Sequence, residues 1–361
     1  MAVPVIPRPP VPAGEVAMFF KHICPPTFGG GPVDPQPATV ELARNLLVGE
    51  KFRIPDGRDI DIWIIEDPDD NVGGRVFPSK AIRVNQGDTV RVRVGSQGDT
   101  HTIHWHGIEP SPVNDGVGKH SFEVSGNFVY QFTPRQAGTY FYHCHKNTTL
   151  HVEMGLYGLL IVDPPGSHPN FLPRQSFTGG PFYHVEAFWV SDEFDTRWHT
   201  LGHDAFMQDC VPDDPVGPQT FSRDGFLNQF KPDVFLITGV ARTSDATPIA
   251  DPRVAVSARV GQTILIRTLN AGYTVQQYTI YGLPATVIAA DGRPLGATPE
   301  TRYSAPFVIP AGRPFRLTSG RRFDLILKPT RPGVYPATVE YFDWITGRRY
   351  AVARTTITVN R

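Results

Sequence analysis

Residues 139–162 read TYFYHCHKNTTLHVEMGLYGLLIV, which places a cysteine between two histidines and a third histidine and a methionine shortly after them. The alternating and β-branched flanks predict a strand, a loop and a second strand. Because alternate residues of a strand share a face, His143 and His145 point one way and Cys144 points the other. One short segment can therefore contact two metal sites, with the thiolate at one and the imidazoles at the other.

A second group of histidines lies upstream, in the stretch His101-Thr-Ile-His104-Trp-His106-Gly107. On a strand, His104 and His106 face the same way, and they can join the second imidazole pair. His101 is then left to join Cys144. A thiolate, two imidazoles and a weak thioether suit a redox-active copper. Zinc fits the ligand types as well, but it explains the sulfur less well.

These two motifs resemble a cupredoxin domain of the multicopper oxidases, the family of the laccases, which has the copper nitrite reductases as relatives. The resemblance rests on HxxHxHG, on the later HCH with a nearby histidine, and on the run GLYGLLIV. It implies that the type 1 copper ligands are His101, Cys144 and His151. It also implies that one domain's share of a type 2/type 3 copper cluster consists of His104, His106, His143 and His145.

Two further roles follow from the same resemblance, and each has an alternative. Counting back from GLYG as in the family puts a non-coordinating Leu156 at the axial position of the type 1 copper. Met154, in HVEM, is the only nearby thioether and is the other candidate. Asp115, in Asn114-Asp115-Gly116, resembles the acidic residue that relays protons to the cluster. The alternative for Asp115 is ordinary turn chemistry, which favours the same residue types.

The second half of the chain repeats the pattern of the first half. Residues 260–267 (VGQTILIR) echo residues 86–93 (QGDTVRVR), which predicts a second β-sandwich. Aligning the repeats puts Gln276, Thr279 and Tyr281 at the places of His101, His104 and His106. The same register puts Thr338, Val339 and Glu340 at the places of His143, Cys144 and His145. No histidine follows His203, so the second domain lacks the ligands with which the family binds copper. We expect this domain to be structural or to form a wall of the site.

Composition agrees with an all-β chain, because 36 prolines and 34 glycines among 361 residues favour short strands and turns. We expect two cupredoxin-like Greek-key β-sandwich domains. The predicted division is an extended N-terminal segment (1–40), a copper-binding cupredoxin domain (41–165), a connecting region (166–250) and a second cupredoxin domain without copper ligands (251–361).

In the connecting region, His199 and His203 have helical spacing, but Gly202 lies between them and we interpret both as structural.

The formal net charge of −1 offers no electrostatic reason to expect nucleic acid or an anionic membrane as a partner. No apolar run is long enough to span a membrane, and the first residues lack the order of a signal peptide. These features predict a cytoplasmic protein, with export and a removed signal as the alternative. Three cysteines form no disulfide framework. Cys24 and Cys210 are interpreted as buried or inert thiols, with a Cys24–Cys210 bridge as the alternative. The two-domain resemblance implies a homotrimer.

Three functions are compatible with these motifs. The family's trinuclear cluster takes four HxH pairs, and this chain has two, so the cluster is expected to be incomplete. The first hypothesis is a copper-dependent, laccase-like oxidoreductase that oxidises a small phenolic or amine substrate and passes the electrons to dioxygen. The second is a type 1 copper electron-transfer or copper-binding protein. The third is a nitrite-reductase-like enzyme.

Overall fold

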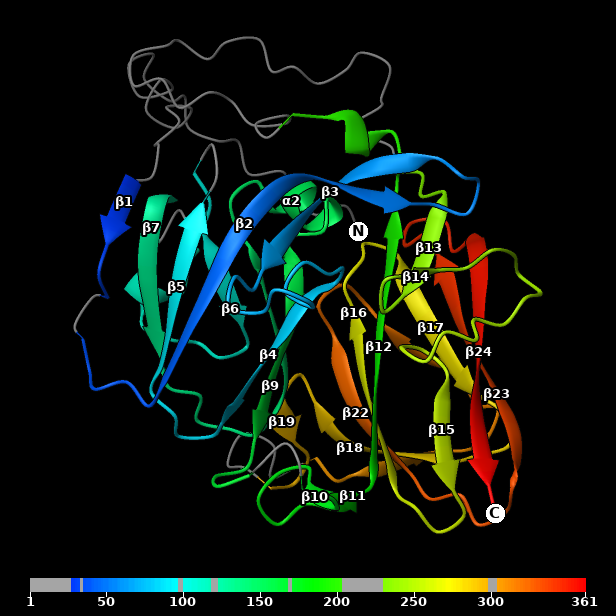
Figure 1. The fold of residues 1–361 in the computed structure, drawn as a ribbon. Helices are drawn as coiled ribbons and strands as arrows, with labels where there is room; N and C mark the ends of the chain where they lie inside the picture. Colours follow the sequence, from blue (N-terminus) through cyan, green and yellow to red (C-terminus); the bar gives the residue numbers. More distant parts are fainter. Residues whose placement is uncertain are drawn as a thin grey trace, which may run out of the picture.

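The computed structural model describes residues 27–32, 35–96, 100–117, 123–167, 171–202, 230–297 and 304–361. Strands dominate these residues and form two β-sandwiches that lie next to each other (Figure 1), so the all-β prediction is confirmed. Within the described ranges, no helix combines the length and the apolar character that crossing a membrane requires. Most of the predicted N-terminal segment, residues 1–26, lies outside these ranges, as do Cys210 and His203.

The first sandwich packs a five-stranded sheet against a four-stranded sheet. The larger sheet has the order β1 (Thr27–Gly30), β7 (Glu123–Phe132), β5 (Val90–Ser96), β2 (Val40–Arg53) and β3 (Asp59–Glu66). The smaller sheet has the order β4 (Ser79–Asn85), β9 (Tyr157–Asp163), β8 (Gly138–Cys144) and β6 (Ile103–His106). Trp105, Tyr130 and Tyr142 fill the space between the sheets, together with alternate valines of β5.

The second sandwich packs an eight-stranded sheet against a five-stranded sheet. The larger sheet runs β14 (Val240–Ala241), β13 (Val234–Ile237), β12 (Val185–Phe194), β16 (Ile264–Asn270), β22 (Arg322–Leu327), β18 (Ala285–Ala290) and β19 (Arg293–Pro294), with β20 (Phe307–Ile309) also on β18. The smaller sheet runs β15 (Val256–Arg259), β24 (Arg349–Asn360), β23 (Gly333–Phe342), β17 (Val275–Ile280) and β21 (Phe315–Leu317). A short ribbon of β10 (Arg174–Gln175) and β11 (Phe182–Tyr183) lies at one end.

The turn of residues 85–88 carries the chain from one sheet of the first sandwich to the other. Asn85 donates its backbone N–H to Asp88 Oδ2 at 2.7 Å, and the Asp88 amide donates to the Asn85 carbonyl at 3.1 Å. Gly87 has φ of 90°, a conformation that glycine adopts without steric cost. The turn lies between β4 and β5.

Strand pairing confirms the register of the internal repeat. In the first sandwich β6 pairs with β8, and His104 lies opposite His143. In the second sandwich β17 pairs with β23, and Thr279 lies opposite Thr338. The positions that carry imidazoles in the first repeat therefore carry threonines in the second.

Part of the predicted connecting region extends the larger sheet of the second sandwich. β12 pairs in parallel with β16 over seven residues, and β13 pairs with β12 on its other edge. Trp189 of β12 is buried in the second core, and its indole N–H donates to the Val254 carbonyl at 2.9 Å. The aromatic run of β12 is therefore core sequence of this sandwich. The domain bounds themselves stay a prediction.

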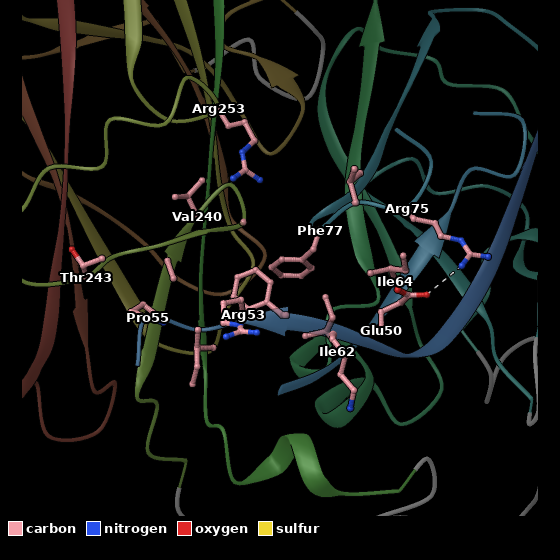
Figure 2. Close-up of a pocket in the computed structure, with 16 residues that line it drawn as sticks. Glu50, Arg53, Pro55, Ile62, Ile64, Arg75, Phe77, Val240, Thr243 and Arg253 are labelled. Atoms are coloured by element: carbon pink, nitrogen blue, oxygen red, sulfur yellow. Dashed lines mark ion pairs between the residues drawn. The ribbon is translucent and has the colours of Figure 1, made fainter. Parts of the chain in front are cut away.

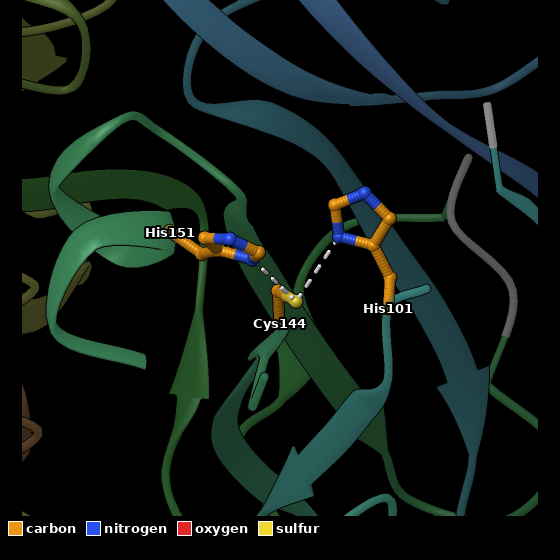
Figure 3. Close-up of side chains that lie close together, drawn as sticks. All are labelled: His101, Cys144 and His151. Atoms are coloured by element: carbon orange, nitrogen blue, oxygen red, sulfur yellow. Dashed lines mark hydrogen bonds between the residues drawn. The ribbon is translucent and has the colours of Figure 1, made fainter. Parts of the chain in front are cut away.

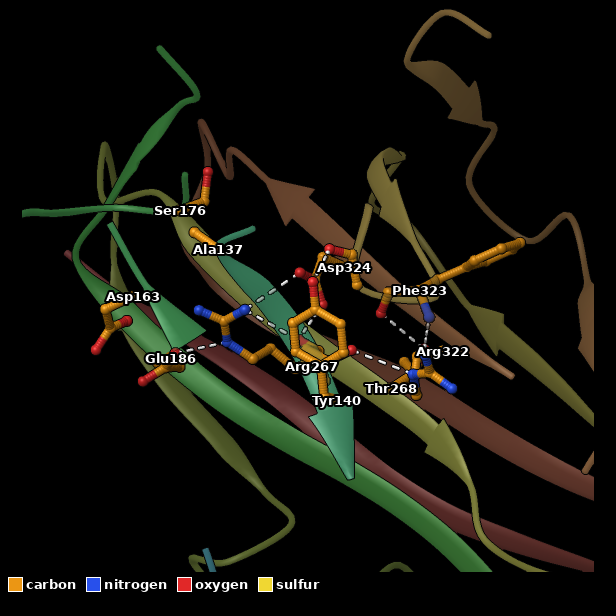
Figure 4. Close-up of polar contacts among 12 residues, drawn as sticks. Ala137, Tyr140, Asp163, Ser176, Glu186, Arg267, Thr268, Arg322, Phe323 and Asp324 are labelled. Carbon is orange, nitrogen blue, oxygen red and sulfur yellow. Dashed lines mark hydrogen bonds and ion pairs between the residues drawn. The ribbon is translucent and has the colours of Figure 1, made fainter. Parts of the chain in front are cut away.

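A buried ion-pair network joins the two sandwiches (Figure 4). Arg267 of β16 has no exposed side-chain surface and contacts Glu186 at 2.7 Å and Asp324 at 3.1 Å. It also donates to the hydroxyl of Thr139, on β8 of the first sandwich, at 2.9 Å. Burial alone would raise the pKa of Glu186, but Arg267 and Arg83 outweigh it and lower that pKa to about 2. These contacts fix β8, the strand that carries the predicted metal ligands, against the second sandwich.

We expect Arg267→Met to lower the free energy of unfolding by roughly 3–5 kcal/mol, because it removes the ion pair of the buried Asp324 carboxylate and one of the cations that contact Glu186. Urea denaturation measures this change. The matched control is Arg349→Ala, which removes a surface ion pair at 2.7 Å from Glu340 and should cost less than about 1 kcal/mol. Equal losses in the two variants would show that the buried network does not hold the sandwiches together.

Candidate metal centre

Cys144 lies between two imidazoles in the core of the first sandwich. Its Sγ is 3.5 Å from Nδ1 of His101 and 3.2 Å from Nδ1 of His151. Figure 3 shows both rings directed at the sulfur. The three side chains are at most 1% exposed, and their ligand atoms lie within 4.8 Å of one another. One sulfur and two imidazole nitrogens are a donor set that fits copper, so the residues present fit the metal predicted from the sequence.

Three different elements deliver these side chains. Cys144 is the last residue of β8, and His101 forms an isolated bridge with Val124 of β7. His151 lies on α2 (Thr148–Glu153), a helix in the loop between β8 and β9. The two predicted strands are therefore present, and the segment between them, which the sequence pattern predicted to be only a loop, contains a helix. A six-residue helix is too short to show a helical period, and tertiary packing stabilises it.

Met154 and Leu156 follow α2, and both are buried in the same core as Cys144. The Met154 carbonyl accepts the Trp63 amide at 2.7 Å, and the Leu156 carbonyl accepts the Cys144 amide at 3.0 Å. Both residues therefore stay candidates for the axial position beside the sulfur.

Four further histidines gather on the other side of Cys144. The ring of His104 lies 5.4 Å from His106, 5.3 Å from His143 and 5.4 Å from His145, measured between ring centroids. Ligand atoms of His104, His106 and His143 lie within 4.8 Å of one another. The pairing of β6 with β8 produces this group, because it sets His104 opposite His143. The four side chains that the resemblance assigns to a second copper site thus lie together.

Backbone carbonyls orient two of these rings. Nδ1 of His104 donates to the Asp115 carbonyl, and Nδ1 of His143 donates to the Cys144 carbonyl, each at 2.9 Å. A carbonyl only accepts, so both Nδ1 atoms carry the proton and each Nε2 presents a lone pair to a metal. Burial lowers the pKa of His143 well below its usual value. The neutral form that binds metals is therefore favoured.

Asp115 contacts this group from the turn after η1 (Pro112–Asn114). Its Oδ1 lies 3.3 Å from Nδ1 of His104, and burial raises the pKa of its carboxyl. Gly116 follows with φ of 72°, and a Cβ there would lie 1.8 Å from the Ile103 carbonyl oxygen. Only glycine lets the turn approach β6 this closely. Asp115 is therefore a residue of a tight turn and also contacts His104, so the two roles considered for it do not exclude each other.

The second sandwich contributes a wall to the four-histidine group. A Cβ on Gly320 would lie 3.3 Å from Cε1 of His106. Arg322 is 2% exposed, and its guanidinium lies 5.5 Å from the Phe141 ring, which in turn stacks on His106 at 4.2 Å. Burial, and then the positive charge of Arg322, lower the pKa of His106 to about 3. The sequence offered no signal for Arg322, because only tertiary packing brings it here.

His199 lies on η2 (Trp198–Thr200) and belongs to neither histidine group. Its Nδ1 donates to the Asp61 carbonyl at 2.5 Å, and its Nε2 lies 3.8 Å from Glu153. This buried, hydrogen-bonded position agrees with the structural role predicted for it. Its predicted neighbour His203, like Cys24 and Cys210, falls outside the described residues.

The fold and the site define a class of protein that consists of two β-sandwiches. The first sandwich carries two groups of candidate metal ligands, one with a cysteine and two histidines and the other with four histidines. Comparison with known proteins agrees with this class. Residues 72–167 match the multicopper oxidase family model, and the groups of histidines and cysteine in the first sandwich are consistent with copper sites.

Curated relatives extend the similarity. Copper resistance protein A of Pseudomonas syringae pv. tomato is 27% identical over 283 residues, covering 70% of this chain and 42% of that protein. L-ascorbate oxidase of Cucumis sativus is 42% identical over 96 residues, covering 25% of this chain and 16% of that protein. The chain thus spans less than half the length of either relative.

A solved structure supports the fold. The blue copper oxidase of Nitrosomonas europaea superposes with a TM-score of 0.62 at 22% identity, covering 89% of this chain and 86% of that chain. The prediction of cupredoxin-like sandwiches is confirmed.

Proposed function

We propose that the protein is a laccase-like copper oxidoreductase that takes single electrons from a small phenolic or amine substrate and delivers them to dioxygen. The observation that carries this proposal is the placement of Cys144 Sγ 3.5 and 3.2 Å from two buried imidazoles, with histidines of the second group on either side of it. In the proposed site, His101, Cys144 and His151 would hold a type 1 copper. Met154 would be the candidate for a further ligand, with Leu156 as the non-coordinating alternative.

The chain's own residues shape the chemistry in three ways. Copper, when bound, supplies a reversible one-electron couple. Cys144 binds as thiolate, and its backbone links directly to His143 and His145, so an electron crosses only covalent bonds between the two groups. Burial of His101 and Cys144 excludes water from the sulfur. Asp115, whose carboxyl pKa is raised by burial, would be the group beside His104 that passes protons for the reduction of dioxygen.

The second site is proposed to be an incomplete trinuclear cluster, held by His104, His106, His143 and His145. Support comes from the threonines at the matching positions of the second sandwich and from Arg322 in its wall. A homotrimer, implied by the two-domain resemblance, is part of the proposal, and the predicted compartment stays a prediction.

The missing histidines also favour a second candidate, a type 1 copper protein that transfers electrons without reducing dioxygen. In that protein the four-histidine group would remain without redox function. Both candidates share the Cys144 site and differ only in what happens beyond it.

An oxygen electrode separates them. We expect copper-loaded protein to consume dioxygen with 2,6-dimethoxyphenol or p-phenylenediamine, in the proportion that reduction to water requires. Metal-free protein under the same conditions is the control. If the phenol bleaches the visible band but air does not restore it, the oxidase proposal is wrong and the electron-transfer candidate stands.

A further inference from the structure

A groove of about 570 Å³ opens between the two sandwiches, where the β2–β3 hairpin faces β14 (Figure 2). Its apolar surface comes from side chains of both sandwiches, chiefly Phe52, Ile62, Ile64, Phe77 and Val240. Its charged lining consists of the single acid Glu50 and of four bases, each of which forms an ion pair with a carboxylate: Lys51, Arg53, Arg75 and Arg253. The groove therefore combines an aromatic surface with edges of ion-paired basic side chains.

One strand separates this groove from the Cys144 site. Ile62 and Ile64 of β3 line the groove, while Trp63 between them points to the opposite face, into the core of the first sandwich. The Trp63 ring lies edge-on to the His151 ring, with 5.0 Å between centroids. Its amide donates to the Met154 carbonyl at 2.7 Å. A single strand, β3, thus separates the groove from the proposed copper ligand His151, and the indole of Trp63 lies on the side of β3 that faces this histidine.

Phe77 makes a second connection between the groove and the site. A Cβ placed on Gly155 would lie 3.0 Å from Cε2 of Phe77, so the ring packs directly on the backbone between α2 and β9. The next residue, Leu156, accepts the Cys144 amide at 3.0 Å. By contrast, His101 and His151 are 1% and 0% exposed, so an external donor does not touch either imidazole directly.

The groove chemistry fits a small aromatic anion. Phe52 and Phe77 meet edge to face, 5.6 Å between centroids, and offer flat surfaces to an aromatic ring. Arg253 donates Nε and Nη2 to Asp251, which leaves Nη1 as a donor for a carboxylate. Arg75 donates Nε to Glu66, and its Nη1 lies 3.6 Å from Glu50. These two arginines lie on opposite sides of Phe77 in Figure 2.

We propose that this groove binds the electron donor as a small phenolic carboxylate, and that the electron crosses β3 through Trp63 to His151. This inference rests on the proposed function. The bound phenol loses one electron and becomes a phenoxyl radical, its proton passes to water, and the electron reduces one cupric ion at Cys144 to the cuprous state. Aromatic packing on Phe77 and an ion pair with Arg253 select the donor.

Binding to the metal-free protein tests the groove without any turnover. The probe is 4-methoxybenzoate, which cannot lose a phenolic proton, and isothermal titration calorimetry measures its affinity. We expect Val240→Trp, which fills the groove, and Arg253→Gln, which removes the charge, each to weaken binding at least about 10-fold. The matched controls are Val308→Trp and Arg349→Gln, exposed positions elsewhere on the second sandwich, which should leave the affinity unchanged.

The Trp63 route has its own measurement. In copper-loaded protein without dioxygen, 4-hydroxybenzoate should bleach the visible band more slowly in Trp63→Leu than in the wild type. Trp63→Phe should recover part of the rate, and both variants should bind 4-methoxybenzoate with unchanged affinity.

The outcomes separate this inference from the proposed function. If copper-loaded wild type develops no intense visible band, the proposed function is wrong and the electron route with it. If the wild type is blue and oxidises phenols, but neither groove variant changes probe binding, the groove inference alone is overturned. Absence of probe binding to the wild type overturns it as well.

Discussion

Replacing Cys144 by serine should abolish the intense visible charge-transfer band of the copper-loaded protein. A serine hydroxyl cannot replace the thiolate, whose bond to copper produces that band. Turnover with phenols should fall by at least about 100-fold, since even the loss of groups that only orient metal ligands costs about 10–100-fold. Absorption spectra and oxygen consumption measure the two effects.

The fold should survive this substitution, because serine is close in size to cysteine and the core around it is otherwise unchanged. Circular dichroism checks that point. Cys210→Ser is the matched control and should keep both the band and the activity. A visible band that persists in Cys144→Ser would remove the type 1 assignment and the proposal built on it.

Removing His104 and His145 together should end the consumption of dioxygen but keep the visible band, which Cys144→Ser is expected to lose. In His104→Ala/His145→Ala we expect the visible band to remain, because His101, Cys144 and His151 are untouched. Consumption of dioxygen should fall by at least about 100-fold, because two of the four imidazoles that could hold the second copper are gone. Anaerobic bleaching of the band by 2,6-dimethoxyphenol should continue at the wild-type rate.

His184→Ala is the control for this double variant. Nδ1 of His184 accepts the Thr263 amide at 3.1 Å, in the second sandwich, so its loss should leave oxygen consumption unchanged. Wild-type oxygen consumption in the double variant would take the four histidines out of the mechanism.

The sequence predicted both the architecture and the groups of residues that the structure brings together. Strand alternation sets Cys144 and its neighbouring histidines on opposite faces, so a local pattern was sufficient there. The repeat register, seen in Thr279 opposite Thr338, was likewise readable because both sandwiches keep the same strand pairing.

Other features depend on contacts between distant segments and had no local signal. The helix that carries His151 is too short for a recognisable period. Arg322 reaches the four-histidine group only because β22 packs beside β8 across the domain interface. Strand β12 reads as a connector in the sequence, and its parallel pairing with β16 is set by the tertiary fold. The groove at Phe77 also has no local signal in the sequence, because residues of both sandwiches line it.

The central claim is that one chain holds a type 1 copper and a second, reactive copper site. Copper content per chain, measured together with visible and electron paramagnetic resonance spectra of the copper-loaded protein, tests it most directly. We predict more than one copper per chain, a blue-site signal, and either a type 2 signal or a magnetically silent coupled pair. A single copper with only the blue-site signal would contradict the claim and leave an electron-transfer protein.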